Sequence, residues 1–355
     1  MRRARVTSLG NAWPGAVELV VDVDGAPGRA LAYPALVGTP GVGEEVLLNT
    51  TAVDLGLGTG GYHLVVANLD QLPPDRTGPG HLVKARYTPL QATVLGVDEE
   101  DSPHRTALAG ATSLDGMPVV VADLHSALPA VVVGALASRP AARIAYVMTD
   151  GGALPLWFSR SVAELTAADA LVGTVTAGQA FGGDLEAVTL HAALLAAQVV
   201  LGADLTVVTQ GPGNLGVGTP WGFSGVAAGD AVNAVAALDG RPVASLRISD
   251  ADPRERHRGI SHHSRTAYGR VALARAGVVV PVLAEPLASA VGQDLTESGI
   301  AARHDLVRVP VDGLLDALRA SAFGLSTMGR GVDEDPAYFL AAAAAGRFAA
   351  GLLAT

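Results

Sequence analysis

The chain has 355 residues, of which 49% are hydrophobic, and it carries a formal net charge of −10. Its length is sufficient for two domains with sizeable cores, and the absence of cysteine excludes disulfides, thiolate chemistry and cysteine-ligated metals. The negative charge argues against nucleic acid as the main partner, because phosphate contacts require a concentrated basic surface.

The apolar residues are spread along the chain and do not form a membrane-spanning segment. The best candidate, residues 187–203, contains His191 and Gln198 and is shorter than the roughly 20 residues that a bilayer requires. Asn11 and Pro14 interrupt the N-terminal segment before the apolar stretch of a signal peptide could form. We therefore expect a cytoplasmic protein that has no membrane partner.

The first 70 residues predict short strands separated by turns that contain glycine and proline. These strands are expected at residues 5–9, 16–23, 29–33, 45–50 and 62–67. Regular short strands of this kind are typical of a small antiparallel β-barrel. A loop at 72–80 and an extended run at 81–94 lead into a polar stretch at 98–105, where we place the domain boundary. The expected domains are residues 1–97 and 98–355.

From about residue 117 the pattern changes to apolar strands that alternate with helices. Strands are predicted at residues 119–122, 143–148, 171–176, 205–209, 243–248, 278–283 and 306–309. Helices are predicted at residues 184–201, 224–238, 262–276, 311–320 and 336–353. This alternation indicates a doubly wound α/β domain, with a mostly parallel sheet covered on both faces. Ligands of such domains bind at the carboxyl ends of the strands.

Three of the predicted strands end in glycine-rich turns, at residues 150–152, 178–183 and 211–226. Because the carboxyl ends of parallel strands share one edge, we expect the turns to converge. Asp184 and Glu186 follow the second turn, where they would cap a helix and repel an anion. The third turn has no acidic residue, and glycine lets main-chain N–H groups approach a ligand closely. Its expected anion-binding residues are Gly211, Gly213, Asn214, Gly216 and Gly218.

Residues 211–216 also match the G-x-G-x-x-G pattern of dinucleotide-binding loops, and Asp250 ends the next predicted strand. Pro220 and Gly222 delay the helix that should begin at the glycines. Asp250 also lies well beyond the usual spacing of about 20 residues. These departures make a dinucleotide the less favoured alternative, and the sequence identifies no cofactor.

A segment rich in arginine and histidine, residues 250–265, follows the glycine-rich turn. An anion-binding wall and a solvated basic face would both account for its arginines. In the first case we expect Arg258 or Arg265 to pair with the anion. Asp123, His125 and Asp150 also follow predicted strands, at the expected ligand edge.

Ser261 is expected to cap the helix that follows it, which places His262 and His263 beside free N–H groups. A neutral imidazole in this position can act as a base or a hydrogen-bond donor. Adjacent side chains leave a helix or a strand in different directions, so we expect only one of the two rings to lie in the site. This spacing favours a catalytic acid or base, oriented by Asp250, over a metal pair, and no metal site is predicted.

Lys84 is the only lysine among 24 basic residues. Its ammonium group is compact and titratable, whereas a guanidinium is planar and always charged. Lys84 is therefore a further candidate for ligand binding, although its retention by chance is the favoured explanation. No G-x-S-x-G, Walker A or H-E-x-x-H motif occurs, so the common hydrolase, nucleotidase and metalloprotease interpretations lack support.

Four segments of the chain resemble an uncharacterised bacterial family, domain-of-unknown-function family 3866. They are residues 49–61 (NTTAVDLGLGTGG), 81–91 (HLVKARYTPLQ), 211–225 (GPGNLGVGTPWGFSG) and 259–264 (GISHHS). The resemblance covers essentially the whole chain. It implies no activity, because the family has none assigned, but it places Lys84 inside one of the four segments.

The sequence as a whole predicts an enzyme that binds a small phosphorylated or carboxylated metabolite at the glycine-rich turn. The apolar content favours a homo-oligomer. A non-catalytic nucleotide or metabolite sensor and an oligomeric scaffold are the alternatives. A catalytic site should bring a histidine and a carboxylate within hydrogen-bond reach at this turn, whereas a sensor needs only hydrogen-bond donors.

Overall fold

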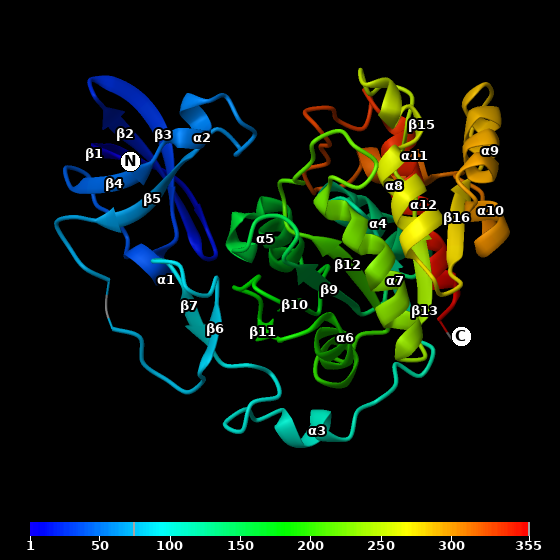
Figure 1. The fold of residues 1–355 in the computed structure, drawn as a ribbon, viewed down its shortest axis with the longest axis horizontal. Helices are drawn as coiled ribbons and strands as arrows, with labels where there is room; N and C mark the ends of the chain where they lie inside the picture. The colour runs from blue at the N-terminus through cyan, green and yellow to red at the C-terminus, as the bar shows by residue number, and fades with distance from the viewer. Residues whose placement is uncertain (74, 354–355) are drawn as a thin grey trace. The chain divides into compact units, whose positions relative to one another are not determined.

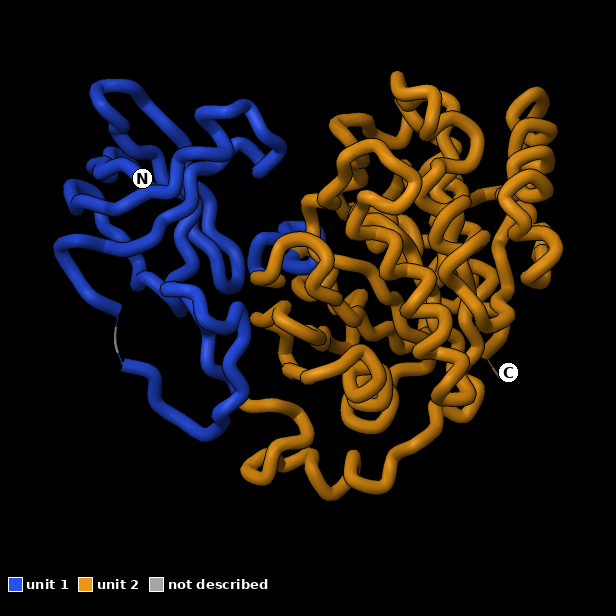
Figure 2. Tube along the Cα trace, in the orientation of Figure 1, with its two compact units in different colours: residues 1–94, 157–163 blue, residues 95–156, 164–355 orange. Residues whose placement is uncertain are grey.

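The strands of the chain form one closed barrel, one large open sheet and two short hairpins, as the computed structural model shows (Figure 1). The structure describes residues 1–73 and 75–353. Two units separate in the fold, the first consisting of Met1–Val94 with Trp157–Ala163 and the second of Leu95–Leu156 with Glu164–Thr355 (Figure 2). Within the described residues, none of the helices combines the length and the apolar character that crossing a bilayer requires.

The barrel of the first unit has five strands, which confirms the predicted barrel. They are β1 (Arg2–Trp13), β2 (Ala16–Val23), β3 (Ala26–Ala32), β4 (Glu45–Asn49) and β5 (His63–Asn68), closed in the order β1-β2-β3-β5-β4. The expectation of an antiparallel barrel is corrected at one pairing, because β3 and β5 run parallel. A closed ring with an odd number of strands cannot alternate in direction throughout, so one neighbouring pair must be parallel.

Segment Trp157–Ala163 is fixed to this barrel by aromatic and ionic contacts. Trp13 donates from Nε1 to the carbonyl oxygen of Trp157 over 2.7 Å. The Trp157 ring packs at a tilt against Tyr33, with centroids 6.0 Å apart. Glu18 accepts hydrogen bonds from Tyr62 and Arg160. Two short helices, α1 (Pro34–Val37) and α2 (Thr51–Asp54), and the hairpin of β6 (Leu82–Lys84) and β7 (Ala92–Val94) complete the first unit.

The second unit contains eight parallel strands, which confirms the predicted doubly wound domain. They are β8 (Pro118–Val121), β9 (Ile144–Thr149), β10 (Gly173–Thr176), β11 (Leu185–Glu186), β12 (Leu205–Gln210), β13 (Arg241–Ser245), β16 (Gly277–Pro281) and β17 (Asp305–Val309). Their order in the sheet is β11-β10-β9-β12-β8-β13-β16-β17. The central strands are buried along their whole length, as expected for a sheet covered on both faces.

Helices cover the two faces of this sheet. α4 (Leu128–Ser138), α11 (Leu314–Arg319) and α12 (Pro336–Gly351) pack together on one face, and α6 (Leu190–Val199) and α7 (Ala227–Ala237) pack together on the other, the nearer face in Figure 1. The other α-helices are α3 (Arg105–Ala109), α8 (His262–Thr266), α9 (Leu287–Glu297), α10 (Ile300–Arg303) and α5 (Arg160–Ala167), which begins in the segment of the first unit. A π-helical turn at Ala267–Val271, the hairpin of β14 (Ile248–Ser249) and β15 (Gly259–Ile260), and 3-10 turns at His125–Ala127, Leu156–Phe158, Ser224–Val226 and Glu255–His257 are also present.

Two glycines allow α4 and α12 to approach each other closely. A methyl group on Gly134 would overlap the carbonyl oxygen of Ala343, and one on Gly346 would overlap that of Val131. The backbones of the two helices are therefore in direct contact at this crossing.

The helix predicted at residues 184–201 begins later than expected. Leu185–Glu186 forms edge strand β11, and α6 begins at Leu190 with Thr189 as its N-cap. Asp184 does not cap this helix, because its Oδ2 accepts hydrogen bonds from the main chain and the side chain of Thr174. The pairing of β11 with β10 satisfies main-chain groups that a longer helix would otherwise have satisfied.

Candidate functional site

The order of the strands singles out the carboxyl ends of β8 and β12. These two strands are neighbours, but the connections that follow them run to opposite sides of the sheet. The chain passes from β8 to β9 on one side and from β12 to β13 on the other. In open α/β sheets ligands bind where the direction reverses in this way. Asp123 lies just after β8, and Gln210, the last residue of β12, donates from Nε2 to the carbonyl oxygen of Asp123 over 2.9 Å.

The three glycine-rich turns converge at this edge, as predicted. Asp150 accepts a hydrogen bond from the main chain of Gln179 over 2.8 Å, which joins the first turn to the second. Gly152 lies very close to Gly211, because a methyl group on Gly152 would overlap the carbonyl oxygen of Gly211. The first turn therefore contacts both of the others.

Loop 211–226 is folded on itself. A bridge pairs Gly216 with Phe223, and Val217 donates to the carbonyl oxygen of Gly222 over 2.8 Å. Of the residues expected to bind an anion, Gly211 already donates its main-chain N–H to the carbonyl oxygen of Thr149 over 3.2 Å. Gly213 and Gly218 have φ angles of +85° and +82°, and a side chain at Gly213 would meet open space. Three apolar side chains of the loop are exposed, those of Leu215, Val217 and Trp221.

Asn214 points inward and holds the base of the loop. Its Oδ1 accepts hydrogen bonds from Gln210 Nε2 over 2.8 Å, from Ser224 Oγ over 3.1 Å and from the main chain of Gly225 over 3.1 Å. Asn214, predicted as a ligand-binding residue, therefore fixes the loop to the end of β12. Gly211 has a similar role, because a methyl group there would overlap the carbonyl oxygen of Ala153.

Three histidines lie together beside this loop. Ser261 caps α8 as predicted, accepting from the main chain of His263 over 3.2 Å. The ring centroids of His262 and His263 are 4.4 Å apart. The ring centroid of His257 lies 4.9 Å from that of His262 and 5.0 Å from that of His263. The expectation that only one of the two adjacent rings faces the site is corrected. The Cβ atoms diverge, but rotation about χ1 and χ2 brings both rings together.

Phe223 connects the histidine cluster to loop 211–226. Its ring stacks on His263 with a centroid distance of 3.9 Å and meets the ring of His262 edge-on at 5.6 Å. Both adjacent histidines therefore lie at the glycine-rich loop.

The carboxylate nearest to these rings is that of Asp123. Its Oδ2 lies 3.5 Å from Nδ1 of His263, and both side chains are buried. This separation is longer than a well-formed hydrogen bond, and Oδ2 has no other hydrogen-bond partner among the described residues. Asp250, expected to orient a histidine, is exposed, and within residues 1–73 and 75–353 its side chain makes no hydrogen bond or ion pair.

Burial and neighbouring charges keep two of the imidazoles neutral. Burial, together with the charges of Arg247 and Arg254, lowers the pKa of His257 to about 2. Burial also lowers the pKa of His262 to about 4, with smaller effects from His263 and Arg256. Both rings are therefore unprotonated at neutral pH, with a nitrogen lone pair available.

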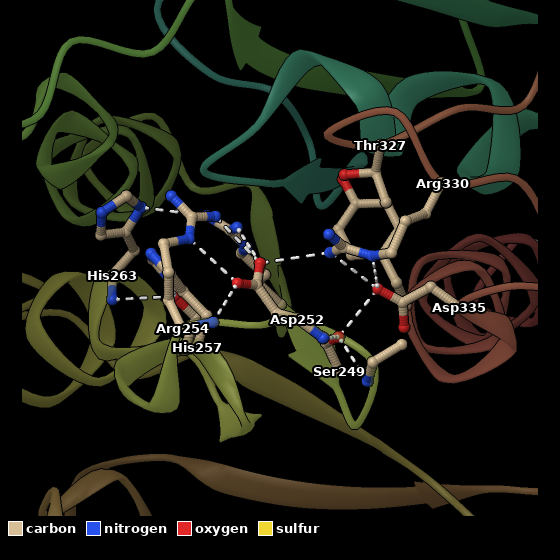
Figure 3. A network of polar contacts seen from close by, with 12 residues as sticks. Ser249, Asp252, Arg254, His257, His263, Thr327, Arg330 and Asp335 are labelled. Atoms are coloured by element: carbon tan, nitrogen blue, oxygen red, sulfur yellow. Dashed lines mark hydrogen bonds and ion pairs between the residues drawn. The ribbon is translucent and has the colours of Figure 1, made fainter.

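A buried network of arginines and carboxylates supports the cluster (Figure 3). Asp252, which is fully buried, is paired with Arg254 at 2.9 Å, Arg330 at 3.2 Å and Arg247 at 3.5 Å. Burial raises the pKa of Asp252, but the hydrogen bonds from Arg254 outweigh this effect and hold the pKa well below its usual range. Arg247 also places Nη1 3.4 Å from Nδ1 of His263, so the network reaches the histidine cluster.

The network extends to the segment before α12. Arg330 pairs with Asp335 at 3.0 Å, and Ser249 donates to the same carboxylate over 2.8 Å. No sequence pattern associates Arg330 or Asp335 with the site. Arg247 lies just before the basic segment 250–265. His257 lies within it and forms an H-x₄-H-H pattern with the two adjacent histidines.

Arg258 and Arg265 lie at a different place from the histidines. They line a cavity of about 640 Å³ whose other lining residues are Pro253, Glu255, Gly259, Ala290, Gln293 and Asp294. Arg265 is paired with Asp294 at 2.9 Å and with Glu297 at 3.3 Å. By contrast, Arg256 is exposed, and among the described residues it makes no hydrogen bond or ion pair. A Cβ atom on Gly218 would lie 3.9 Å from the guanidinium of Arg256.

Two further candidates lie elsewhere. Lys84 belongs to β6 in the first unit and is fully buried. His125 follows β8 and contacts the hydroxyl of Tyr146 over 2.9 Å, which in turn contacts Thr209 over 2.8 Å. Burial lowers the pKa of His125 to about 4, so this ring is a neutral member of a buried hydrogen-bond chain.

Comparison with known proteins places the chain in one family. The model of a family described as proteins of unknown function, DUF3866, matches residues 29–346. The chain belongs to this family. Among curated proteins, and among solved structures, the comparisons found no match.

Proposed function

We propose that this member of the DUF3866 family is an enzyme that uses acid–base chemistry on a small anionic molecule, phosphorylated or carboxylated. The reaction would take place at the carboxyl ends of β8 and β12. The observation that carries the proposal is the pairing of His263 with Asp123 beneath loop 211–226. A binding protein without catalysis would need hydrogen-bond donors there, but no buried carboxylate facing an imidazole.

Asp123 would orient His263 in this reaction. A carboxylate at Nδ1 favours the tautomer with its proton on Nδ1, which leaves Nε2 as the base. Arg247 Nη1, which can only donate, lies 3.4 Å from the same nitrogen, so this role requires Nδ1 to pair with Asp123 and not with Arg247. The distance of 3.5 Å between these groups is compatible with such a role, because catalytic hydrogen bonds are often long before the substrate binds. Asp123 thus takes the part that the sequence assigned to Asp250.

The anion would be held by Arg256 with the glycine backbone of the loop. Arg265 already has two carboxylate partners, and Arg258 donates from Nε to the carbonyl oxygen of Asp252 over 3.1 Å. The guanidinium of Arg256 lies near Gly218 and makes no hydrogen bond or ion pair within the described part of the chain, and its charge lowers the pKa of His262. A guanidinium can bind carboxylate or phosphate with two parallel hydrogen bonds.

Binding can be tested with inorganic phosphate in the presence of a chelator, by isothermal titration and thermal shift. Arg256→Ala should weaken phosphate binding at least tenfold. The matched control is Arg303→Ala, because Arg303 is an exposed arginine of α10 that makes no hydrogen bond or ion pair among the described residues. Equal affinities in the two variants would contradict the assigned anion site.

Catalysis is tested separately by screening phosphomonoesters and carboxylate metabolites for turnover. For any substrate found, Asp123→Asn should lower kcat by roughly 100-fold or more, which is the usual contribution of a positioned acid or base. Phosphate affinity should change much less. Phosphate binding without turnover of any compound in the panel would favour the sensor alternative.

A further inference from the structure

We propose that His257, His262 and His263 together bind one divalent transition-metal ion. This inference goes beyond the proposed function, which requires no metal. If it holds, His263 acts as a metal ligand and not as a free base.

The first argument is the convergence of the three side chains. Each histidine offers one ring nitrogen, and these nitrogens all lie within 4.8 Å of one another. Tetrahedral zinc with Zn–N bonds of about 2.0–2.1 Å requires nitrogens roughly 3.4 Å apart. Small rotations of the rings would therefore close the site around an ion.

The second argument is how the rings are oriented. Nδ1 of His257 contacts Ser261 Oγ at 2.7 Å, and Nδ1 of His263 lies 3.5 Å from Asp123 Oδ2 and 3.4 Å from Arg247 Nη1. These contacts leave Nε2 of both rings for an ion. Metal-binding histidines usually hold their second nitrogen in this way, with a carboxylate or another oxygen as the partner.

The third argument is a buried nitrogen without a partner. Nε2 of His262 is buried and has no hydrogen-bond partner among the described residues. A buried polar atom normally has a partner, because leaving it unsatisfied costs the free energy of its lost hydration. A bound ion would provide the missing partner for this nitrogen.

The surrounding charges restrict the kind of site. Arg247, Arg254 and Arg256 face the histidines and oppose a cation, whereas Asp123 and Asp252 favour it. An ion in this environment would be stabilised by an anion as its fourth ligand. Three protein ligands leave that position open, which is the arrangement of catalytic and not of structural zinc sites.

The ligand set also restricts the metal. Imidazole nitrogens suit Zn²⁺, Co²⁺, Ni²⁺ and Cu²⁺, whereas Mg²⁺ and Ca²⁺ prefer oxygen ligands. We therefore expect Zn²⁺ and Co²⁺ to bind and Mg²⁺ to have no effect, even in large excess.

The test uses the full chain, freed of metal with a chelator and titrated with Co²⁺. We expect one Co²⁺ per chain by elemental analysis, an intense visible absorption typical of tetrahedral Co²⁺, and displacement by Zn²⁺. His257→Ala and His262→Ala should each lower the affinity at least 100-fold and abolish the absorption. His191→Ala is the matched control, since His191 is an exposed histidine of α6 in the same unit.

Asp123→Asn provides a variant that keeps the shape of the site if an alanine variant fails to fold. It should weaken Co²⁺ binding about 10- to 100-fold, as expected for loss of a group that orients a ligand. The proposal is wrong if no Co²⁺ binds, or if binding persists in folded His257→Ala and His262→Ala, which would indicate an unrelated surface site. Phosphate binding in chelator tests the proposed function independently, so the two proposals can fail separately.

Discussion

The ring of Phe223 lies flat on the imidazole of His263, with centroids 3.9 Å apart and an angle of 3° between the planes. Phe223 belongs to the glycine-rich loop and His263 to the first turn of α8. This stacked pair joins the most glycine-rich segment of the second unit to its histidine cluster. The position of the loop and that of the rings therefore depend on each other.

Replacing Phe223 by alanine should loosen the loop and destabilise the protein. Phe223 is buried, and the loss of a buried phenylalanine costs about 3–5 kcal/mol. Urea denaturation measures this loss, and amide hydrogen exchange should be faster at residues 215–224. Trp221→Ala is the control, because Trp221 is 62% exposed and its loss should change stability by about 0.5 kcal/mol or less. Similar effects of the two substitutions would argue against the stacked pair as the anchor of the loop.

Stability should fall as the pH is lowered from 6.5 toward 5. The pKa of His257 is lowered to about 2 and that of His262 to about 4, so the folded state binds fewer protons than the unfolded state in this range. Above about pH 6.5, which is the pKa of histidine in the unfolded chain, both states hold neutral rings and the free energy of unfolding is highest. Below that pH the unfolded state takes up protons that the folded state does not, so the free energy of unfolding decreases. Urea denaturation at several pH values measures the slope.

The slope can be assigned to the cluster with a variant. Each histidine that stays neutral contributes up to about 1.4 kcal/mol per pH unit between its two pKa values. His262→Gln should therefore make the slope between pH 6.5 and 5 shallower. A free energy of unfolding that does not change over this range would show that these imidazoles are not kept neutral by the fold.

Gly346→Ala should destabilise the protein by about 1–3 kcal/mol or more, because the methyl group would push α12 away from the carbonyl oxygen of Val131 on α4. Gly292→Ala is the control within a helix. Nothing lies within 4 Å of a methyl group there, and alanine is the better helix former, so this change should stabilise α9 by about 0.5–1 kcal/mol. Thermal unfolding of the two variants should shift in opposite directions. A shift in the same direction would contradict the close crossing of the helices.

Arg330→Ala should cost about 3 kcal/mol, because it leaves the buried carboxylates of Asp252 and Asp335 with fewer positive partners. Arg319→Ala is the matched control. Arg319 pairs with Asp333 at the surface, where both side chains are more than half exposed, and such pairs contribute about 1 kcal/mol or less. Denaturant midpoints of the two variants should separate clearly. If they coincide, the buried network does not stabilise the fold.

The α/β unit could be predicted from sequence because its strands are continuous apolar runs with glycines at their ends. The observed β12, Leu205–Gln210, begins where it was predicted and ends one residue later. Edge strand β11 has only two residues, and a run that short carries no periodic signal. Its main-chain pairing with β10 decides its conformation, which no local pattern reveals.

The site was predictable only in part, for a similar reason. The glycine-rich loop and the basic segment stand out by composition, and both contribute to the cluster. The partner of His263, however, follows β8 and is distant along the chain, and Arg330 is separated from Asp252 by 78 positions. Contacts of this kind depend on the order of the strands in the sheet, which the alternation of strands and helices does not determine.

The inclusion of Trp157–Ala163 in the first unit has a consequence for biosynthesis. On the ribosome, the barrel strands emerge early, but the segment that contacts Trp13, Glu18 and Tyr33 emerges only after Leu95–Leu156. The N-terminal unit therefore cannot be completed cotranslationally until part of the following unit has been synthesised. No single cleavage of the polypeptide can release either unit as an intact fragment.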